Sequence, residues 1–102
     1  MAGPSFVKGS RSFQAQMLTQ LARSLGHQHR FAEARQILDK AGAVIGDEKD
    51  LAKVRLWLER GRMFYFSVEY DRARTWFLAA WHLANELGEE YYAVDAAHML
   101  GL

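Results

Sequence analysis

The feature that most constrains the fold of this chain is an internal repeat. When the sequence is shifted by 39 residues against itself, residues of similar size and character align along most of its length. The matched positions are Leu18 with Trp57, Leu25 with Phe64, Phe31 with Tyr70, Ala34-Arg35 with Ala73-Arg74, Leu38 with Phe77 and Ala41 with Ala80. Self-similarity at such a period is typical of repeat arrays, in which each unit covers the apolar face of its neighbour.

The pattern within each repeat predicts helices and no strand. The only proline is Pro4, so no proline interrupts a helix later in the chain. Apolar residues recur at helical spacing in five segments, which are separated near residues 26–30, 46–47, 67–69 and 88. We expect Gly46 and Gly88 to end helices, and Asp47 to cap the helix that follows it. The sequence therefore predicts an all-α fold of five helices.

One known family combines this kind of repeat with these residue types. The spacing W-x2-L-G-x2-Y followed by A-x3-F resembles the tetratricopeptide repeat (TPR), and it is carried by Trp57, Gly61, Phe64, Ala73 and Phe77. The first repeat has Leu18, Leu21, Ala22, Leu25, Ala34 and Leu38 at the same spacings. Arg60 departs from the pattern, which prefers Leu there. The resemblance implies antiparallel helix-turn-helix units stacked as a right-handed α-solenoid of about 2.5 units, in an extended variant with a repeat of about 40 residues.

The resemblance covers nearly the whole chain. We expect a flexible leader at residues 1–11 and a TPR domain at residues 12–102, with units at 13–46 and 47–88 and a partial third unit at 89–102. Solenoids normally end in a polar capping helix, so either the chain is a fragment of a longer array or a second chain covers the last helix. The residues expected to mediate self-association are Tyr91, Tyr92, Val94, Met99, Leu100 and Leu102.

A stretch rich in arginine and aromatic residues, RGRMFYFSVEYDRARTWF at residues 60–77, raises the alternative of nucleic-acid binding. The repeat places its aromatic residues in the helical interior instead. We expect Phe64, Tyr70 and Phe77 in the core, close to the small residue Gly61, and we expect Trp76 to pack on a neighbouring helix. The arginines are then expected mostly on solvated faces. The net charge of the chain is +1, so no strong overall field attracts nucleic acid or an acidic membrane.

The charge is nevertheless distributed unevenly. Residues 1–35 contain five basic residues and one acidic residue, a net charge of +4. Residues 86–102 contain four acidic residues and no Lys or Arg, a net charge of −4. A basic head and an acidic tail favour head-to-tail contact between copies. The basic half also supports an alternative function, a regulatory or nucleic-acid-associated adaptor, whose affinity would fall steeply with salt.

In the TPR family the first helix of each unit lines the concave surface, and the resemblance implies that ligands bind there. The residues expected on that surface are Gln16, Thr19, Gln20, Arg23, Arg55, Glu59, Arg62, Tyr65, Phe66 and His98. The three arginines each suit a carboxylate, which arginine holds through two hydrogen bonds; alternatively they pair with Glu59 and Asp95 or face water. We expect a protein-protein interaction scaffold that binds a peptide or partner domain on its concave face and self-associates as a homo-oligomer.

Other kinds of site find little support in the sequence. The chain has no cysteine, which excludes disulfides and thiolate metal sites. His27 and His29 have no acidic partner nearby, so we expect no metal. Asp95 and His98 lack a nucleophile or an oxyanion donor to complete a catalytic site, so we expect no enzyme activity and no cofactor. No apolar run reaches the roughly 20 residues of a membrane span, and we expect a cytoplasmic protein that does not bind membranes.

Overall fold

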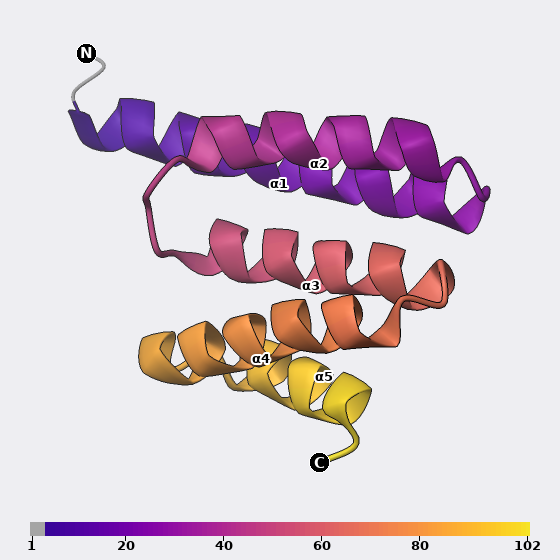
Figure 1. Cartoon of the computed structure of the whole chain (residues 1–102). Coiled ribbons are helices and arrows are strands. Elements are labelled where there is room, and N and C mark those ends of the chain that lie inside the picture. The colour runs from indigo at the N-terminus through magenta and orange to yellow at the C-terminus, as the bar shows by residue number, and fades with distance from the viewer. Residues whose placement is uncertain (1–3) are drawn as a thin grey trace.

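The computed structural model describes residues 4–102, with the side chains of residues 10–102. Over the described residues the chain forms five helices and no strand: α1 (Pro4–His27), α2 (Phe31–Ile45), α3 (Leu51–Phe66), α4 (Tyr70–Leu87) and α5 (Glu90–Leu100). The predicted all-α class is therefore confirmed. Consecutive helices run in opposite directions, with α1 and α2 at one end of the molecule, α3 in the middle, and α4 and α5 at the other end (Figure 1). None of the described helices is both long enough and apolar enough to cross a membrane.

The first helix begins earlier than the sequence predicts. Residues 4–11 belong to α1, although they were expected to form a flexible leader. Pro4 is compatible with this start, because a proline in the first turn of a helix loses no intrahelical hydrogen bond. Residues 1–3 of the expected leader lie outside the described residues.

Two glycines end helices as predicted, but the helix that follows the first of them is capped by a different residue than expected. Gly46 follows the last residue of α2 and Gly88 follows the last residue of α4, each with a positive φ that glycine adopts at little cost. The prediction that Asp47 caps α3 is wrong. Asp50 has the extended backbone of a capping residue, and its carboxylate accepts a hydrogen bond from the Lys53 backbone N–H at 3.2 Å.

The core consists of two clusters that meet at α3. The first joins α1, α2 and one side of α3, and the second joins α3, α4 and α5. Trp57, on α3, packs against both clusters. Small residues lie at the contacts in both, and Ala22, Ala34 and Ala73 are buried. The central helix α3 therefore holds the two halves of the molecule together.

The helices α3 and α4 approach each other closely at Gly61. A Cβ atom added there would lie 2.5 Å from Cε1 of the buried Phe77 ring, so only glycine fits. This contact confirms the packing predicted for both residues. Phe64 is half-buried at the edge of the second cluster. Trp76 packs on α3 as predicted, with its ring centroid 6.5 Å from that of Trp57.

The prediction that Tyr70 lies in the core is wrong. Its side chain is 55% exposed, because it is the first residue of α4 and lies at the end of the short connection from α3. Its ring stacks edge-on against Tyr65, with the ring centroids 5.1 Å apart. The repeat pattern therefore identifies an aromatic position correctly but not its depth.

Candidate functional site

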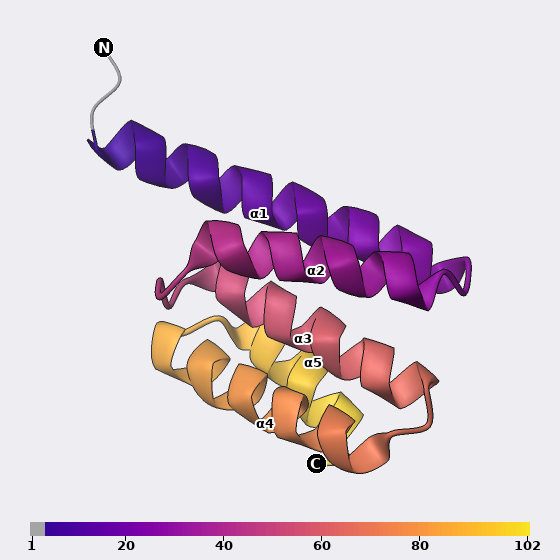
Figure 2. The same ribbon diagram turned by 45° about the horizontal axis from the view of Figure 1, so that its top comes forward.

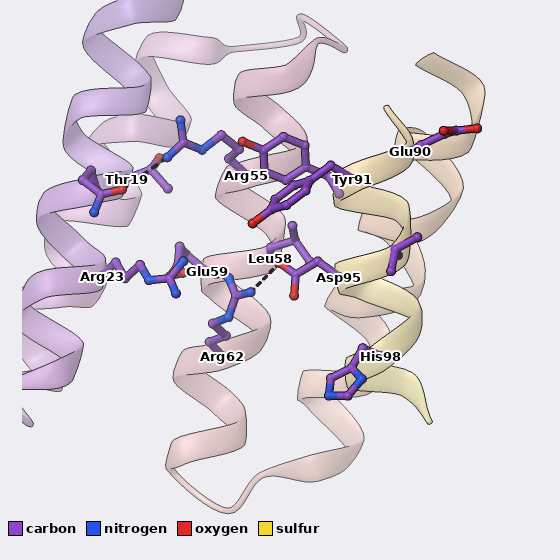
Figure 3. Close-up of a pocket in the computed structure, with 13 residues that line it drawn as sticks. Thr19, Arg23, Arg55, Leu58, Glu59, Arg62, Glu90, Tyr91, Asp95 and His98 are labelled. Carbon is purple, nitrogen blue, oxygen red and sulfur yellow. Dashed lines mark hydrogen bonds and ion pairs between the residues drawn. The ribbon is translucent and has the colours of Figure 1, made fainter. Parts of the chain in front are cut away.

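Side chains from three alternate helices enclose a groove with a volume of about 740 Å³ (Figure 3). The lining residues are Thr19, Gln20 and Arg23 of α1, Arg55, Leu58, Glu59 and Arg62 of α3, and Glu90, Tyr91, Tyr92, Val94, Asp95 and His98 of α5. None of the described residues of α2 or α4 lines it. The groove is thus built by the first, third and fifth helices.

A buried ion-pair network joins two walls of the groove. Arg62 Nη1 donates a hydrogen bond to Glu59 Oε2 at 3.1 Å, and Nη2 donates to Asp95 Oδ2 at 2.6 Å. The second bond ties α3 to α5, and Figure 3 shows it between the two helices. Burial by itself lowers the pKa of Arg62, but its two carboxylate partners raise that pKa above its ordinary value. The Arg62 guanidinium therefore stays charged, and its charge is neutralised within the protein.

One carboxylate oxygen of this network has no hydrogen-bond donor among the described residues. Glu59 is 3% exposed, and its Oε1 atom accepts no hydrogen bond. Arg23 Nε is 4.0 Å from that oxygen, which is beyond hydrogen-bonding distance. A buried acceptor left without a partner costs about 1–3 kcal/mol. A ligand that donates a hydrogen bond to Glu59 Oε1 would remove that cost.

Arg55 lies on the same face of α3 as Glu59, one helical turn earlier, and its guanidinium is held by two neutral glutamine side chains. Arg55 Nη1 donates to Gln16 Oε1 at 2.7 Å, and Nη2 donates to Gln20 Oε1 at 3.3 Å. Amide oxygens fix the position of a guanidinium without neutralising it, and a guanidinium has five N–H donors. Arg55 therefore differs from Arg62, because its charge and some of its donors remain available to a ligand.

The wall formed by α5 is more apolar. Tyr91 and Val94 are highly exposed, and the Tyr91 ring stacks edge-on against Tyr92 with the centroids 5.0 Å apart. Figure 3 shows Tyr91, Asp95 and His98 projecting from α5 towards α3. A ligand in the groove would therefore meet charged and amide groups on α1 and α3, and on α5 it would meet aromatic and aliphatic groups beside the carboxylates of Glu90 and Asp95.

The structure brings together most of the residues predicted for the concave surface. Those that line the groove are Thr19, Gln20, Arg23, Arg55, Glu59, Arg62 and His98, and Gln16 supports them through Arg55. Tyr65 and Phe66 do not line it, because they lie at the C-terminal end of α3, where Tyr65 stacks on Tyr70. Thr19 offers a ligand little, since its buried hydroxyl donates to the Ala15 carbonyl oxygen.

The residues predicted for self-association fall into three groups. Tyr91, Tyr92 and Val94 line the groove. Met99 and Leu100 are half-buried and pack on the second core cluster, so they contribute to the fold of this chain. Leu102 follows the end of α5 and is exposed.

Sequence reasoning placed Glu59 on the groove surface but missed its burial and the amide support of Arg55. The repeat contained a signal for the second feature. Gln16 and Arg55 are 39 residues apart, as are Gln20 and Glu59, so each pair occupies equivalent positions on adjacent first helices. Across residues 4–102 no three His, Asp or Glu side chains are grouped so that they could hold a metal ion.

Comparisons of the chain with protein-family models, with curated proteins and with solved structures found no match.

Proposed function

We propose that this chain is a TPR-like right-handed solenoid that binds a peptide or a partner domain in the groove between α1, α3 and α5. The observation that carries the proposal is that the first helix of each helix pair contributes to a single groove. A groove lined by three helices suits an extended segment, which can contact all three of them. We assign no catalytic step to it.

The chemistry of the groove indicates what such a segment would carry. Arg55 offers an unneutralised guanidinium, which favours a carboxylate, and Glu59 Oε1 offers a buried acceptor, which favours a backbone N–H or another neutral donor. The two residues are one turn apart on α3, about 6 Å along the helix. Tyr91 and Val94 on the opposite wall favour an apolar or aromatic side chain.

The alternative function, a nucleic-acid-associated adaptor, rests on five basic residues of the N-terminal half, and two of them already lie against acidic residues of this chain. Arg30 is paired with Glu33 through its side chain, and Arg23 lies against Glu59 in the groove. Neither cation is presented freely to a phosphate backbone.

The test begins with selection of a random peptide library displayed on phage against the wild-type chain. The selected peptides are then synthesised, and their affinities are measured by isothermal titration calorimetry. We expect Arg55→Gln and Tyr91→Ser, which alter opposite walls, each to weaken binding about tenfold or more, because each removes a charge-assisted or aromatic contact. Arg72→Gln is the matched control for charge, since Arg72 is an exposed residue of α4 outside the groove.

Failure to select any peptide would contradict the proposal. So would peptides that bind wild type and both groove variants with equal affinity, because their site would lie elsewhere. Binding of a duplex oligonucleotide that falls steeply with salt would support the adaptor instead.

A further inference from the structure

We infer that this chain carries a second interaction surface, on the outer face of α1, and that this surface docks on α5 of a second copy. The head surface is formed by Phe13, Met17 and Leu21, which are 67%, 56% and 47% exposed. They follow one another at intervals of four residues, so they form one apolar stripe along α1. Leu21 occupies a position of the TPR-like pattern, but α1 turns its side chain away from the core.

The stripe is distinct from both other faces of α1. The core face carries Ala15, Ala22 and Leu25, and the groove face carries Gln20 and Arg23. Three large apolar side chains exposed in one line are uncommon on a monomeric protein and indicate a surface that another molecule covers. From Phe13 to Leu21 the stripe extends about 12 Å along the helix axis.

A complementary surface lies at the other end of the same molecule. The tail surface is formed by Tyr91 and Val94 of α5, which are 77% and 68% exposed and one turn apart. In Figure 1 α1 lies at the top of the molecule and α5 at the bottom, and in Figure 2 α2 and α3 lie between them. The described parts of α1 and α5 do not pack on each other, so the head and tail surfaces of one molecule do not meet. Tyr91 and Val94 also edge the groove, so a copy docked there would narrow access to it.

The charge distribution favours head-to-tail docking over the symmetric alternatives. Residues 1–53, which include α1 and α2, contain eight basic and five acidic residues, a net charge of +3. Residues 75–102 contain four acidic residues and no Lys or Arg, a net charge of −4. Two heads or two tails would bring like charges together, whereas a head and a tail attract. The occupant that fits both surfaces is therefore another copy of this chain.

Head-to-tail contact is heterologous, because the two surfaces that meet are different. Each docked copy leaves one head and one tail free, so assembly continues as an open chain and does not stop at a dimer. This association requires no ligand in the groove. Head-to-tail association can therefore be absent in a chain that binds peptides, and it can be present in a chain that binds none.

The test uses one variant for each surface and measures molar mass by light scattering behind gel filtration over a wide concentration range. Met17→Glu places an acid where the acidic tail should dock, and Val94→Lys places a cation where the basic head should dock. Both positions are exposed, so both variants should keep the wild-type circular dichroism spectrum and melting temperature. Gln36→Glu is the control, because it makes the same charge change at an exposed position of α2.

We expect the mass of the wild type and of Gln36→Glu to rise continuously with concentration and to fall when salt is added. Each surface variant alone should stay at the monomer mass of 11.7 kDa. An equimolar mixture of the two variants should double that mass and rise no further, because it contains one intact head and one intact tail. A wild type that stays monomeric would overturn the inference. A variant that still dimerises alone, or a mixture that stays monomeric, would overturn it as well.

Discussion

Gly61 and Gly42 are both helical glycines at contacts between helices, yet they leave very different amounts of space. A Cβ atom at Gly61 would lie 2.5, 2.7 and 2.9 Å from three atoms of the Phe77 ring, which is itself buried and has no room to retreat. At Gly42 the nearest atom would be Arg60 Nη2 at 3.4 Å, at the end of a flexible side chain. Position 61 therefore requires glycine, whereas position 42 tolerates alanine.

We predict that Gly61→Ala lowers the free energy of unfolding by about 1–3 kcal/mol, because overpacking forces the Phe77 ring out of its site. The matched variant Gly42→Ala should raise it by up to about 1 kcal/mol, because alanine favours the helix more than glycine does. Urea denaturation followed by circular dichroism measures both. If Gly61→Ala is as stable as wild type, the α3–α4 contact is looser than described.

The sequence was sufficient to predict the Gly61–Phe77 contact but not the burial of Glu59. The first is local to one repeat unit, where small and large residues at fixed spacings identify each other. The resemblance to the TPR family implied a place for Glu59 on the groove face of α3. Its depth, however, depends on Arg62 and on Asp95, which lies 33 residues beyond Arg62 and reaches it through the packing of α5. No local pattern carries that information.

The first residue of a helix is also hard to predict from local sequence, because a connection can contain more than one residue able to cap the helix. Asp47 and Asp50 both precede α3, and either type of residue can cap a helix. Asp50 directly precedes α3 and has an extended backbone, and its carboxylate accepts a hydrogen bond from the N–H of the residue three positions on. The sequence predicted the existence of the helix correctly, but the choice of cap depends on the path of the connection between residues 46 and 50.

We predict that Asp50→Ala lowers the free energy of unfolding by about 1 kcal/mol, the usual cost of removing a capping side chain. Asp47→Ala removes the same charge from the same connection and should change it by less than about 0.5 kcal/mol. Thermal and urea denaturation of the two variants side by side measure the difference. Equal losses would indicate that the charge near the start of α3, and not the hydrogen bond, stabilises the helix.

For the molecule as a whole, the repeat predicted which helices would be neighbours and therefore where a groove would form. The repeat did not predict that α1 and α5 would differ in how extensively they contact α3. The helix α1 makes a more extensive contact with α3 than α5 does, and α5 packs mainly on α4. The hydrogen bond from Arg62 to Asp95 is therefore the main polar link between α5 and the central helix. A packing difference of this kind arises from contacts between units, which the similarity of the units does not reveal.

We predict that Asp95→Ala loosens α5 selectively. Hydrogen bonds to charged groups contribute about 1.5 kcal/mol or more, so amide hydrogen exchange in α5 should become roughly tenfold faster while exchange in α1 and α2 stays unchanged. Asp39→Ala is the matched control, because it removes an ion pair with Arg60 between α2 and α3 in which the Asp39 side chain is well exposed.

The distribution of the exchange rates decides between two pictures of the molecule. Faster exchange confined to α5 would mean that this helix opens as a unit and that the groove can widen without disturbing the first core cluster. An equal increase in all helices would mean that the two clusters unfold together through α3, and the Arg62–Asp95 bond would then stabilise the whole molecule. Unchanged exchange in α5 would show that its apolar packing on α4 suffices to hold it, and the groove would then keep its shape without the ion-pair network.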